Sequence, residues 1–113
     1  MLSVHIKGLR KKVFSRLAPE IAKTVSELIR APGEPVLVSR DAAVFYEDGA
    51  PRRDMVLVEL RWRTRPQEML ELAERLRVLL QDAAGCGEVA VSFGQWQPEE
   101  LYTFHAEESG LDE

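Results

Sequence analysis

Residues 55–63 read Met-Val-Leu-Val-Glu-Leu-Arg-Trp-Arg, and from residue 58 onward apolar and polar side chains alternate. This period of two is typical of a β-strand with one buried face. The chain opens on a similar stretch at residues 2–7, and each stretch is followed by an amphipathic helical pattern and then by another apolar strand. The order strand, helix, strand therefore occurs twice, over about 2–46 and 55–94. Crossovers of this length join parallel strands and are almost always right-handed, so the sequence predicts two β-α-β units.

The helix of the first unit is predicted from Ser15 or Ala18 to Arg30, after an irregular basic segment over 9–14. Its apolar residues recur at steps of three and four positions and form a single stripe. Pro19 is expected in the first turn of this helix, where the missing N–H is tolerated.

A strand is predicted over 36–46, with a bend near Asp41. The run Glu47-Asp48-Gly49-Ala50-Pro51 is the clearest turn in the chain, because Asp, Gly and Pro are the residues that turns favour. This turn is expected to separate the two units.

In the second unit, Thr64 and Gln67 have the spacing of a capping box, with Pro66 in the first turn of the helix. This helix also carries one apolar stripe, and Gly85 is expected to end it in a left-handed conformation. The remaining expected elements are a strand over 88–94, a helical turn over 98–101, a short strand over 102–104 and a frayed acidic tail over 106–113.

The strands have an apolar face and a polar face, because successive residues of a strand point to opposite sides. Each helix has one apolar stripe, so both helices must cover the apolar face. The predicted fold is therefore α+β, a two-layer sandwich of duplicated β-α-β units in which a four-stranded mixed sheet carries two helices on one face. An uncovered polar face suits symmetric assembly. The residues expected on it are Ser3, His5, Lys7, Glu59, Arg61, Arg63, Ala90, Ser92 and Gly94.

The composition limits the functions that the chain can have. Its 113 residues are the size of one domain, taken here as 1–113. The net charge of −4 and the pI of about 5.3 favour neither nucleic acid nor acidic lipid as a partner. No apolar run approaches the roughly 18 residues that span a membrane, and no signal-peptide pattern is present, so a cytoplasmic location is expected. A single cysteine, Cys86, forms neither a disulfide nor a metal site alone, and no metal or cofactor is expected.

Three stretches carry a resemblance to a known family. They are the Ala31-Pro32 break before a strand, the run 88–93 followed by 97–102, and the run 58–68. On these stretches the chain resembles the tautomerase superfamily, which includes 4-oxalocrotonate tautomerase and macrophage migration inhibitory factor. The run 58–68 is most similar to an uncharacterised bacterial branch, a domain of unknown function. The resemblance implies a homotrimer with the helices outside and the sheets around a central channel.

The chain departs from this family at the catalytic positions. The resemblance implies an N-terminal proline as general base, but the matching residue is Leu2. A bulky second residue is expected to leave Met1 in place, which moves the amine by about 3.3 Å along the strand and out of reach of its target. Leu37 stands about where 4-oxalocrotonate tautomerase carries a substrate-binding arginine, and Ala90 where migration inhibitory factor carries a pocket tyrosine. Lys12 retains a positive charge near where the family carries another.

Three functions remain open. The first is a tautomerase-fold trimer with altered or lost catalysis that binds a small carboxylate, for which Lys12, Arg61 and Arg63 are the candidate contacts. The second is an active tautomerase, or a related lyase, that isomerises a keto-enol carboxylate with the Met1 amine or His5 as the base. The third is a small-molecule-binding regulatory domain with the ferredoxin-like order β-α-β-β-α-β. The departures from the family favour the first.

Overall fold

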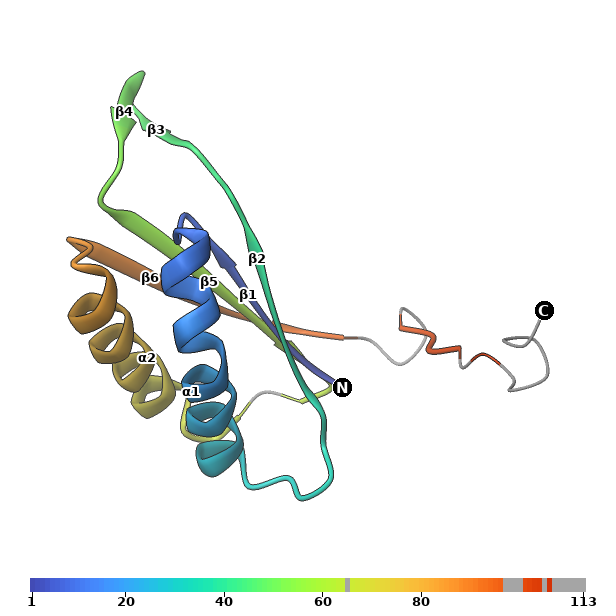
Figure 1. The fold of residues 1–113 in the computed structure, drawn as a ribbon. Coiled ribbons are helices and arrows are strands. Elements are labelled where there is room, and N and C mark those ends of the chain that lie inside the picture. The colour runs from blue at the N-terminus through green and yellow to red at the C-terminus, as the bar shows by residue number, and fades with distance from the viewer. Residues whose placement is uncertain (65, 97–100, 105, 107–113) are drawn as a thin grey trace.

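The computed structural model of the chain describes residues 1–64, 66–96, 101–104 and 106. The helical turn expected over 98–101 and the tail expected over 106–113 lie outside the described residues, except at positions 101 and 106. The elements, in chain order, are β1 (Leu2–Lys7), α1 (Lys11–Ile29), β2 (Val36–Asp41), β3 (Phe45–Glu47), β4 (Ala50–Arg52), β5 (Met55–Trp62), α2 (Met69–Ala84) and β6 (Glu88–Gln95) (Figure 1).

Four strands form one sheet in the order β2-β1-β5-β6. Strand β1 is parallel to β2, β5 is parallel to β6, and the two pairs meet through the antiparallel pairing of β1 with β5. The prediction of two β-α-β units in a mixed sheet is therefore confirmed. The ferredoxin-like alternative is wrong, because that fold splits each β-α-β unit with an intervening strand, whereas β1 here lies directly beside β2.

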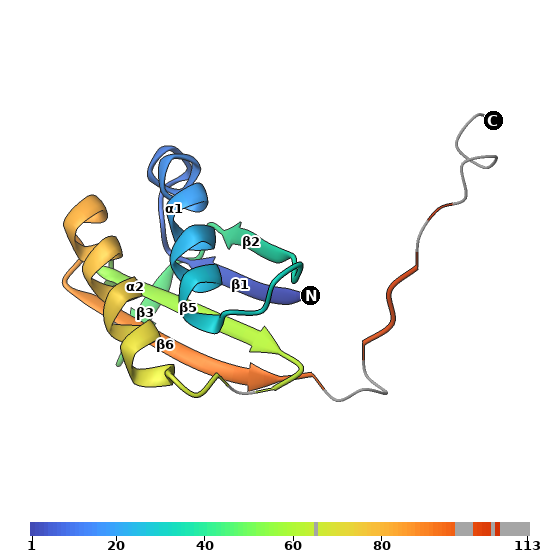
Figure 2. The ribbon, with the colours of Figure 1, turned by 90° about the horizontal axis from the view of Figure 1, so that it is seen from below.

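Both helices lie on the same face of the sheet (Figure 2). The side chains between the two layers form the core, and the opposite face of the sheet carries no helix in the described part of the chain. The predicted two-layer α+β sandwich with one uncovered polar face is confirmed. The core residues are Leu2, Val4, Ile6, Leu9, Leu17, Ile21, Val25, Leu28, Val56, Val58, Leu60, Trp62, Leu72, Leu76 and Leu80.

The first helix begins earlier than the sequence predicts. Helix α1 starts at Lys11, within the segment expected to be irregular, and Pro19 lies in its interior rather than in its first turn. Leu9 is buried just before the helix and Phe14 packs against the core, so tertiary contacts stabilise a basic first turn that has no capping side chain. Pro19 is exposed, so water can reach the carbonyl that its missing N–H leaves unpaired.

The second helix begins later than the sequence predicts. Thr64 and Gln67 make no capping bond and, with Pro66, precede α2, so the capping-box prediction is wrong. The backbone C=O of Trp62 still accepts a hydrogen bond from the N–H of Trp96, just after β6. The chain then needs several further residues to pass from the sheet layer to the helix layer. Gly85 ends the helix in the left-handed conformation, with φ 65° and ψ 24°, as predicted.

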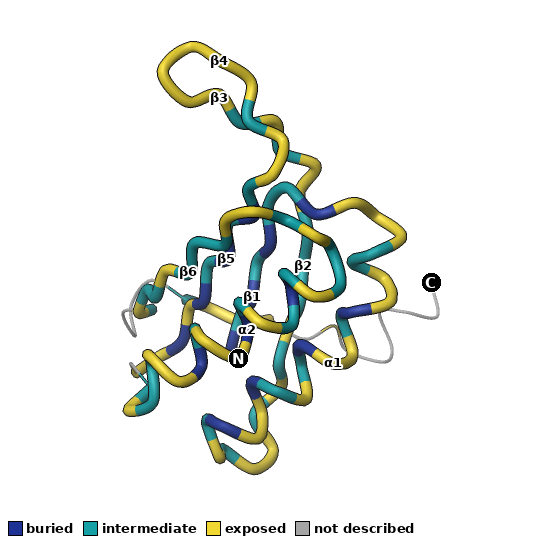
Figure 3. Tube along the Cα trace, turned by 90° about the vertical axis from the view of Figure 1, so that its left-hand side faces the viewer, coloured by how far each residue is buried: buried dark blue, intermediate teal, exposed yellow. Residues whose placement is uncertain are grey.

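The strand predicted over 36–46 is in fact two strands. Strand β2 ends at Asp41, and β3 pairs with β4 in a hairpin that projects from the body of the molecule (Figure 3). The turn residues Asp48 and Gly49 have positive φ angles of 52° and 82°, as tight hairpin connections require. The short strand expected over 102–104 does not form.

Candidate functional site on the uncovered sheet face

The uncovered face of the sheet brings residues of all four strands into rows, because the strands pair in a regular register. The polar surface expected from the alternation of side chains is therefore continuous across the sheet. One row consists of Ser39, His5, Glu59 and Ser92, and a neighbouring row consists of Leu37, Ser3, Arg61 and Gly94.

Arg61 is held in a defined position on this face. Its guanidinium carbon lies 5.1 Å from the centroid of the Trp96 ring, which is a cation–π arrangement. The arginine side chain crosses Gly94, where a Cβ atom would lie 3.1 Å from Cγ and 3.3 Å from Nε of Arg61. Gly94 therefore provides the space through which Arg61 reaches Trp96. The alternation of side chains placed Arg61 on this face, but only the register of β5 with β6 shows what holds it there.

A cavity of about 260 Å³ lies beside this arginine. Among the described residues Arg61 makes no ion pair, whereas Glu59 is paired with Lys7 at an Oε1–Nζ distance of 3.3 Å. The cationic group is therefore open to an anion that enters the cavity. The residues that line the cavity are Glu59, Leu60, Arg61, Ser92, Phe93 and Gly94.

The indole N–H of Trp96 is buried and has no hydrogen-bond partner within the part of the chain that the structure describes. Buried polar groups in proteins almost always have a partner. This N–H therefore lacks an acceptor among the described residues, and it belongs to the residue on which Arg61 stacks.

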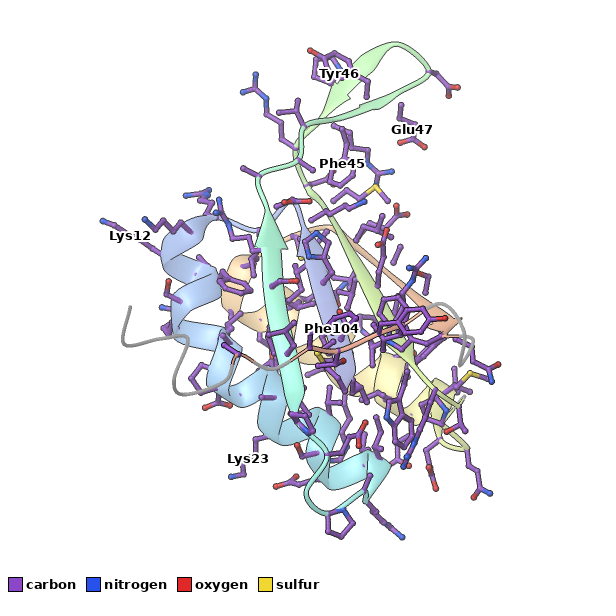
Figure 4. The ribbon with its side chains drawn as sticks, turned by 90° about the vertical axis from the view of Figure 1, so that its right-hand side faces the viewer. Lys12, Lys23, Phe45, Tyr46, Glu47 and Phe104 are labelled. Atoms are coloured by element: carbon purple, nitrogen blue, oxygen red, sulfur yellow. The ribbon has the colours of Figure 1, made fainter. Side chains whose placement is uncertain are left out.

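The other two cations predicted to contact a ligand lie elsewhere. Arg63 stacks on Trp62, with 5.3 Å between the guanidinium carbon and the ring centroid, and it does not line the cavity. Lys12 is exposed in the first turn of α1 and points away from the body of the molecule (Figure 4). Within one protomer, the structure does not bring Lys12, Arg61 and Arg63 together.

The Met1 amine is engaged by a carboxylate. Its nitrogen lies 2.8 Å from Oε1 of Glu34, and the indole N–H of Trp62 donates to the same oxygen at 2.6 Å. The hydrogen bond from the Met1 ammonium, and then that from Trp62, hold the pKa of Glu34 below its usual value of 4.5. The Met1 amine is therefore engaged with Glu34 and is not free to contact a substrate.

His5 lies between two side chains of β2. Its Nδ1 is 2.6 Å from Oγ of Ser39, and its Nε2 is 2.9 Å from Oδ2 of Asp41. Ser39 is the partner of His5 in the parallel pairing, and Asp41 follows two residues later on the same face. Sequence reasoning missed Ser39 and Asp41, because they are 34 and 36 positions from His5 and become neighbours only through the pairing of β1 with β2.

The structure gives no support for a reactive thiol, a metal site or a membrane span among the described residues. Burial raises the pKa of the Cys86 thiol, so little thiolate is available at neutral pH. No group of three or more His, Cys, Asp or Glu side chains in the described residues could hold a metal ion. Neither helix among those residues combines the length and the apolar character that crossing a membrane requires.

Residues 1–105 match the family model of a domain of unknown function, DUF1904. The chain belongs to the DUF1904 family. A crystal structure of a DUF1904 domain from Sebaldella termitidis ATCC 33386 superposes on this chain with a TM-score of 0.69, over 91% of this chain and 95% of the other, at 16% sequence identity. A comparison with curated proteins finds no significant match to this DUF1904 sequence.

Two further solved structures share the DUF1904 fold. The macrophage migration inhibitory factor-like protein of Entamoeba histolytica has a TM-score of 0.73, with 18% identity, over 93% of this chain and 96% of the other. N1, a member of the cis-3-chloroacrylic acid dehalogenase family, has a TM-score of 0.73, with 15% identity, over 90% of this chain and 80% of the other. The predicted relation to the tautomerase superfamily is thereby confirmed at the level of the fold.

Proposed function

We propose that this chain forms a homotrimer that binds a small carboxylate on the polar face of each sheet, and that it does not use its N-terminal amine as a base. The observation that carries the proposal is the Arg61 guanidinium, which lies over Gly94 and against the ring of Trp96 beside the 260 Å³ cavity. A guanidinium offers a planar fork of donors that matches a carboxylate. Because the stacking already restricts the Arg61 side chain, little more conformational entropy is lost when a ligand binds.

The other groups at the cavity favour a ligand with a second polar group. The Ser92 hydroxyl can donate or accept a hydrogen bond. Glu59 also lines the cavity, and its charge is balanced by Lys7. The cavity is smaller than the roughly 300–1,000 Å³ of drug-sized sites. A short keto acid or hydroxy acid fits these features.

Assembly is supported by apolar side chains that the protomer leaves exposed. Leu37, on the polar face of the sheet, is 52% exposed, and Val44 and Tyr46, at the projecting hairpin, are 78% and 66% exposed. In the proposed trimer these side chains would contribute to the apolar contacts between chains. The resemblance to the tautomerase superfamily implies a trimer with the sheets inside, and such a trimer would cover Leu37.

The alternative function is a keto-enol tautomerase with the Met1 amine or His5 as the base. The contact with Glu34 disfavours Met1, because its amine is engaged by that carboxylate at 2.8 Å instead of being open to a substrate. Both ring nitrogens of His5 already have hydrogen-bond partners, so neither is open to a substrate C–H group. Ligand binding is therefore the function that the geometry supports best.

Isothermal titration calorimetry with pyruvate, lactate, malonate and crotonate tests the proposal. The Arg61→Gln variant removes the charge, and we expect it to bind at least about tenfold more weakly, since a hydrogen bond to a charged group contributes about 1.5–3 kcal/mol. Arg53→Gln removes an exposed arginine that does not line this cavity, and it should bind like the unmodified protein. The proposal is wrong if none of the four acids binds, or if the two variants bind equally well.

A further inference from the structure

We propose that Ser39 is the nucleophile of a second site, activated by His5 and with Asp41 orienting the imidazole ring, and that this site accepts the acyl group of a small activated ester. The site lies on β1 and β2, and none of its three residues lines the cavity beside Arg61. Two short hydrogen bonds carry the inference, because they join a hydroxyl, an imidazole and a carboxylate in sequence.

The hydrogen-bond partners of the ring assign the roles of its two nitrogens. A carboxylate accepts but does not donate, so Nε2 of His5 carries the proton that points to Asp41, at 2.9 Å. In the neutral ring Nδ1 is then the acceptor, and the Ser39 hydroxyl donates to it at 2.6 Å. The proton that must leave before Ser39 can attack is thus already directed at a base. A serine, a histidine and an aspartate also activate the nucleophile in hydrolases of unrelated folds, although there Nε2 faces the serine and Nδ1 the aspartate, the reverse of the arrangement here.

The open edge of the sheet supplies further parts of the site. In an edge strand, alternate residues direct their backbone N–H groups away from the sheet, and β2 is an edge strand. The C=O of Asp41 accepts the N–H of Gly8 at 3.3 Å, so Asp41 and Ser39 bond toward β1 and the N–H of Arg40 faces the open edge. This N–H directly follows the nucleophile and can donate to a developing oxyanion.

In the first half of the reaction, Oγ of Ser39 forms a bond to the carbonyl carbon of the ester while its proton passes to Nδ1 of His5. The C–O bond to the alcohol then breaks, and the alcohol leaves with that proton. In the second half, water attacks the acyl-serine ester and gives a proton to Nδ1. The bond between Oγ of Ser39 and the acyl carbon then breaks, Oγ takes back the proton from Nδ1, and a carboxylic acid is released. No group is oxidised or reduced.

Labelling with an alkyl fluorophosphonate probe tests the assignment on the full-length protein, with intact mass and peptide mapping as readouts. We expect one adduct, on Ser39, which Ser39→Ala abolishes. His5→Gln should slow labelling by about 100-fold, because a positioned general base contributes about 10²–10⁴ in rate. Ser15→Ala removes an exposed hydroxyl on α1 and should label like the unmodified protein.

A second comparison stays informative if His5→Gln does not fold. In a Cys86→Ser background, Ser39→Cys should react with iodoacetamide about tenfold faster than Ser15→Cys at neutral pH, because His5 takes the thiol proton in the first variant alone. Labelling of Ser39 that depends on His5, or faster alkylation of Ser39→Cys, supports the proposal. No adduct on Ser39, an equal labelling rate in folded His5→Gln, or equal alkylation of the two variants overturns it.

Discussion

Gly94 and Arg61 are partners in the parallel pairing of β5 with β6, and the arginine side chain crosses the glycine at the place where any other residue would have its Cβ atom. The exposed Arg61 side chain thus packs on the ring of Trp96 and over Gly94. It makes no ion pair among the described residues. The absence of a Cβ atom at residue 94 thus lets Arg61 pack closely over this position.

The Gly94→Ala variant is expected to bind a carboxylate about tenfold more weakly, a loss of about 1.4 kcal/mol. The added Cβ would lie 3.1 Å from Cγ of Arg61, so the side chain must shift by a few tenths of an ångström, which disturbs its packing on Trp96. Calorimetry measures the affinity, and urea unfolding should show a free energy of unfolding within about 1 kcal/mol of the unmodified protein. Unchanged affinity in a folded variant would show that Arg61 does not need this space.

Light scattering coupled to size exclusion is expected to report about three times the 12.8 kDa mass of the chain. The reason is the uncovered polar face, together with the exposed Leu37 upon it. Leu37→Glu should shift the mass toward that of one chain, because it places a charge within the proposed contact. Leu70→Glu, on the outer helix layer and 77% exposed, is the matched control and should leave the mass unchanged. A monomer at micromolar concentration in the unmodified protein would contradict the trimer.

Stability should depend on pH through Glu34. The folded state lowers the pKa of this carboxyl. The ionised carboxylate therefore adds its full share to the free energy of unfolding above the usual pKa of 4.5, and this share is lost as the pH falls through the lowered pKa. Urea unfolding of Glu34→Gln between pH 7 and pH 3 should therefore show a deficit in the free energy of unfolding that narrows as the pH falls below about 4.5. Glu27→Gln, at an exposed position of α1, serves as the control. A deficit that does not change with pH would mean that the ion pair with Met1 does not stabilise the fold.

Ketonisation of phenylenolpyruvate should be slow, with kcat/KM well below about 10⁴ M⁻¹s⁻¹, because the Met1 amine is paired with Glu34. A Leu2→Pro variant from which Met1 is removed exposes a secondary amine at the family position, and its rate should rise. Leu2→Ala exposes a primary amine at the same place and should leave the rate unchanged, and intact mass establishes the N-terminus of each protein. A rate in the usual enzyme range for the unmodified chain would restore Met1 or His5 as a working base.

Leu76→Ala is expected to lower the free energy of unfolding by about 2–5 kcal/mol, because Leu76 is fully buried between α2 and the sheet. Val78→Ala, on the same helix but 46% exposed, should change it by about 0.5 kcal/mol or less. Denaturant titration measures both. A loss below about 1 kcal/mol for Leu76→Ala would mean that the helix stripe is assigned to the wrong face.

The faces of the sheet were predictable because burial repeats with the same period as the side chains of a strand. Val58 and Leu60 are buried while Glu59 between them is not, and every residue of the strand contributes to this alternation of apolar and polar side chains. Helix boundaries were less predictable, because contacts distant in the sequence decide them. Leu9 and Phe14 extend α1 beyond its local start signal, and the crossing from sheet to helix layer delays α2 beyond Thr64.

The candidate site was predictable only one strand at a time. Alternation along β1 and β5 placed His5 and Arg61 on the polar face, and the structure confirms that placement. It did not identify the neighbours that give these residues their chemistry, since Ser39 and Gly94 belong to strands that a helix separates from them in the chain. The hydrophobic pattern fixes which face of each strand is buried, but which residues of two strands become neighbours across a helical crossover depends on packing of the whole core.

The hairpin turn at Asp48 and Gly49 lies between two units, each of which contains its own parallel strand pair and the helix that connects it. A backbone break at this turn would leave both crossover connections whole. The units would still share one antiparallel seam, between β1 and β5, and one apolar core. The architecture is thus that of two half-length polypeptides connected by a short hairpin. A gene split at this turn would encode two chains that together contain every strand of the sheet.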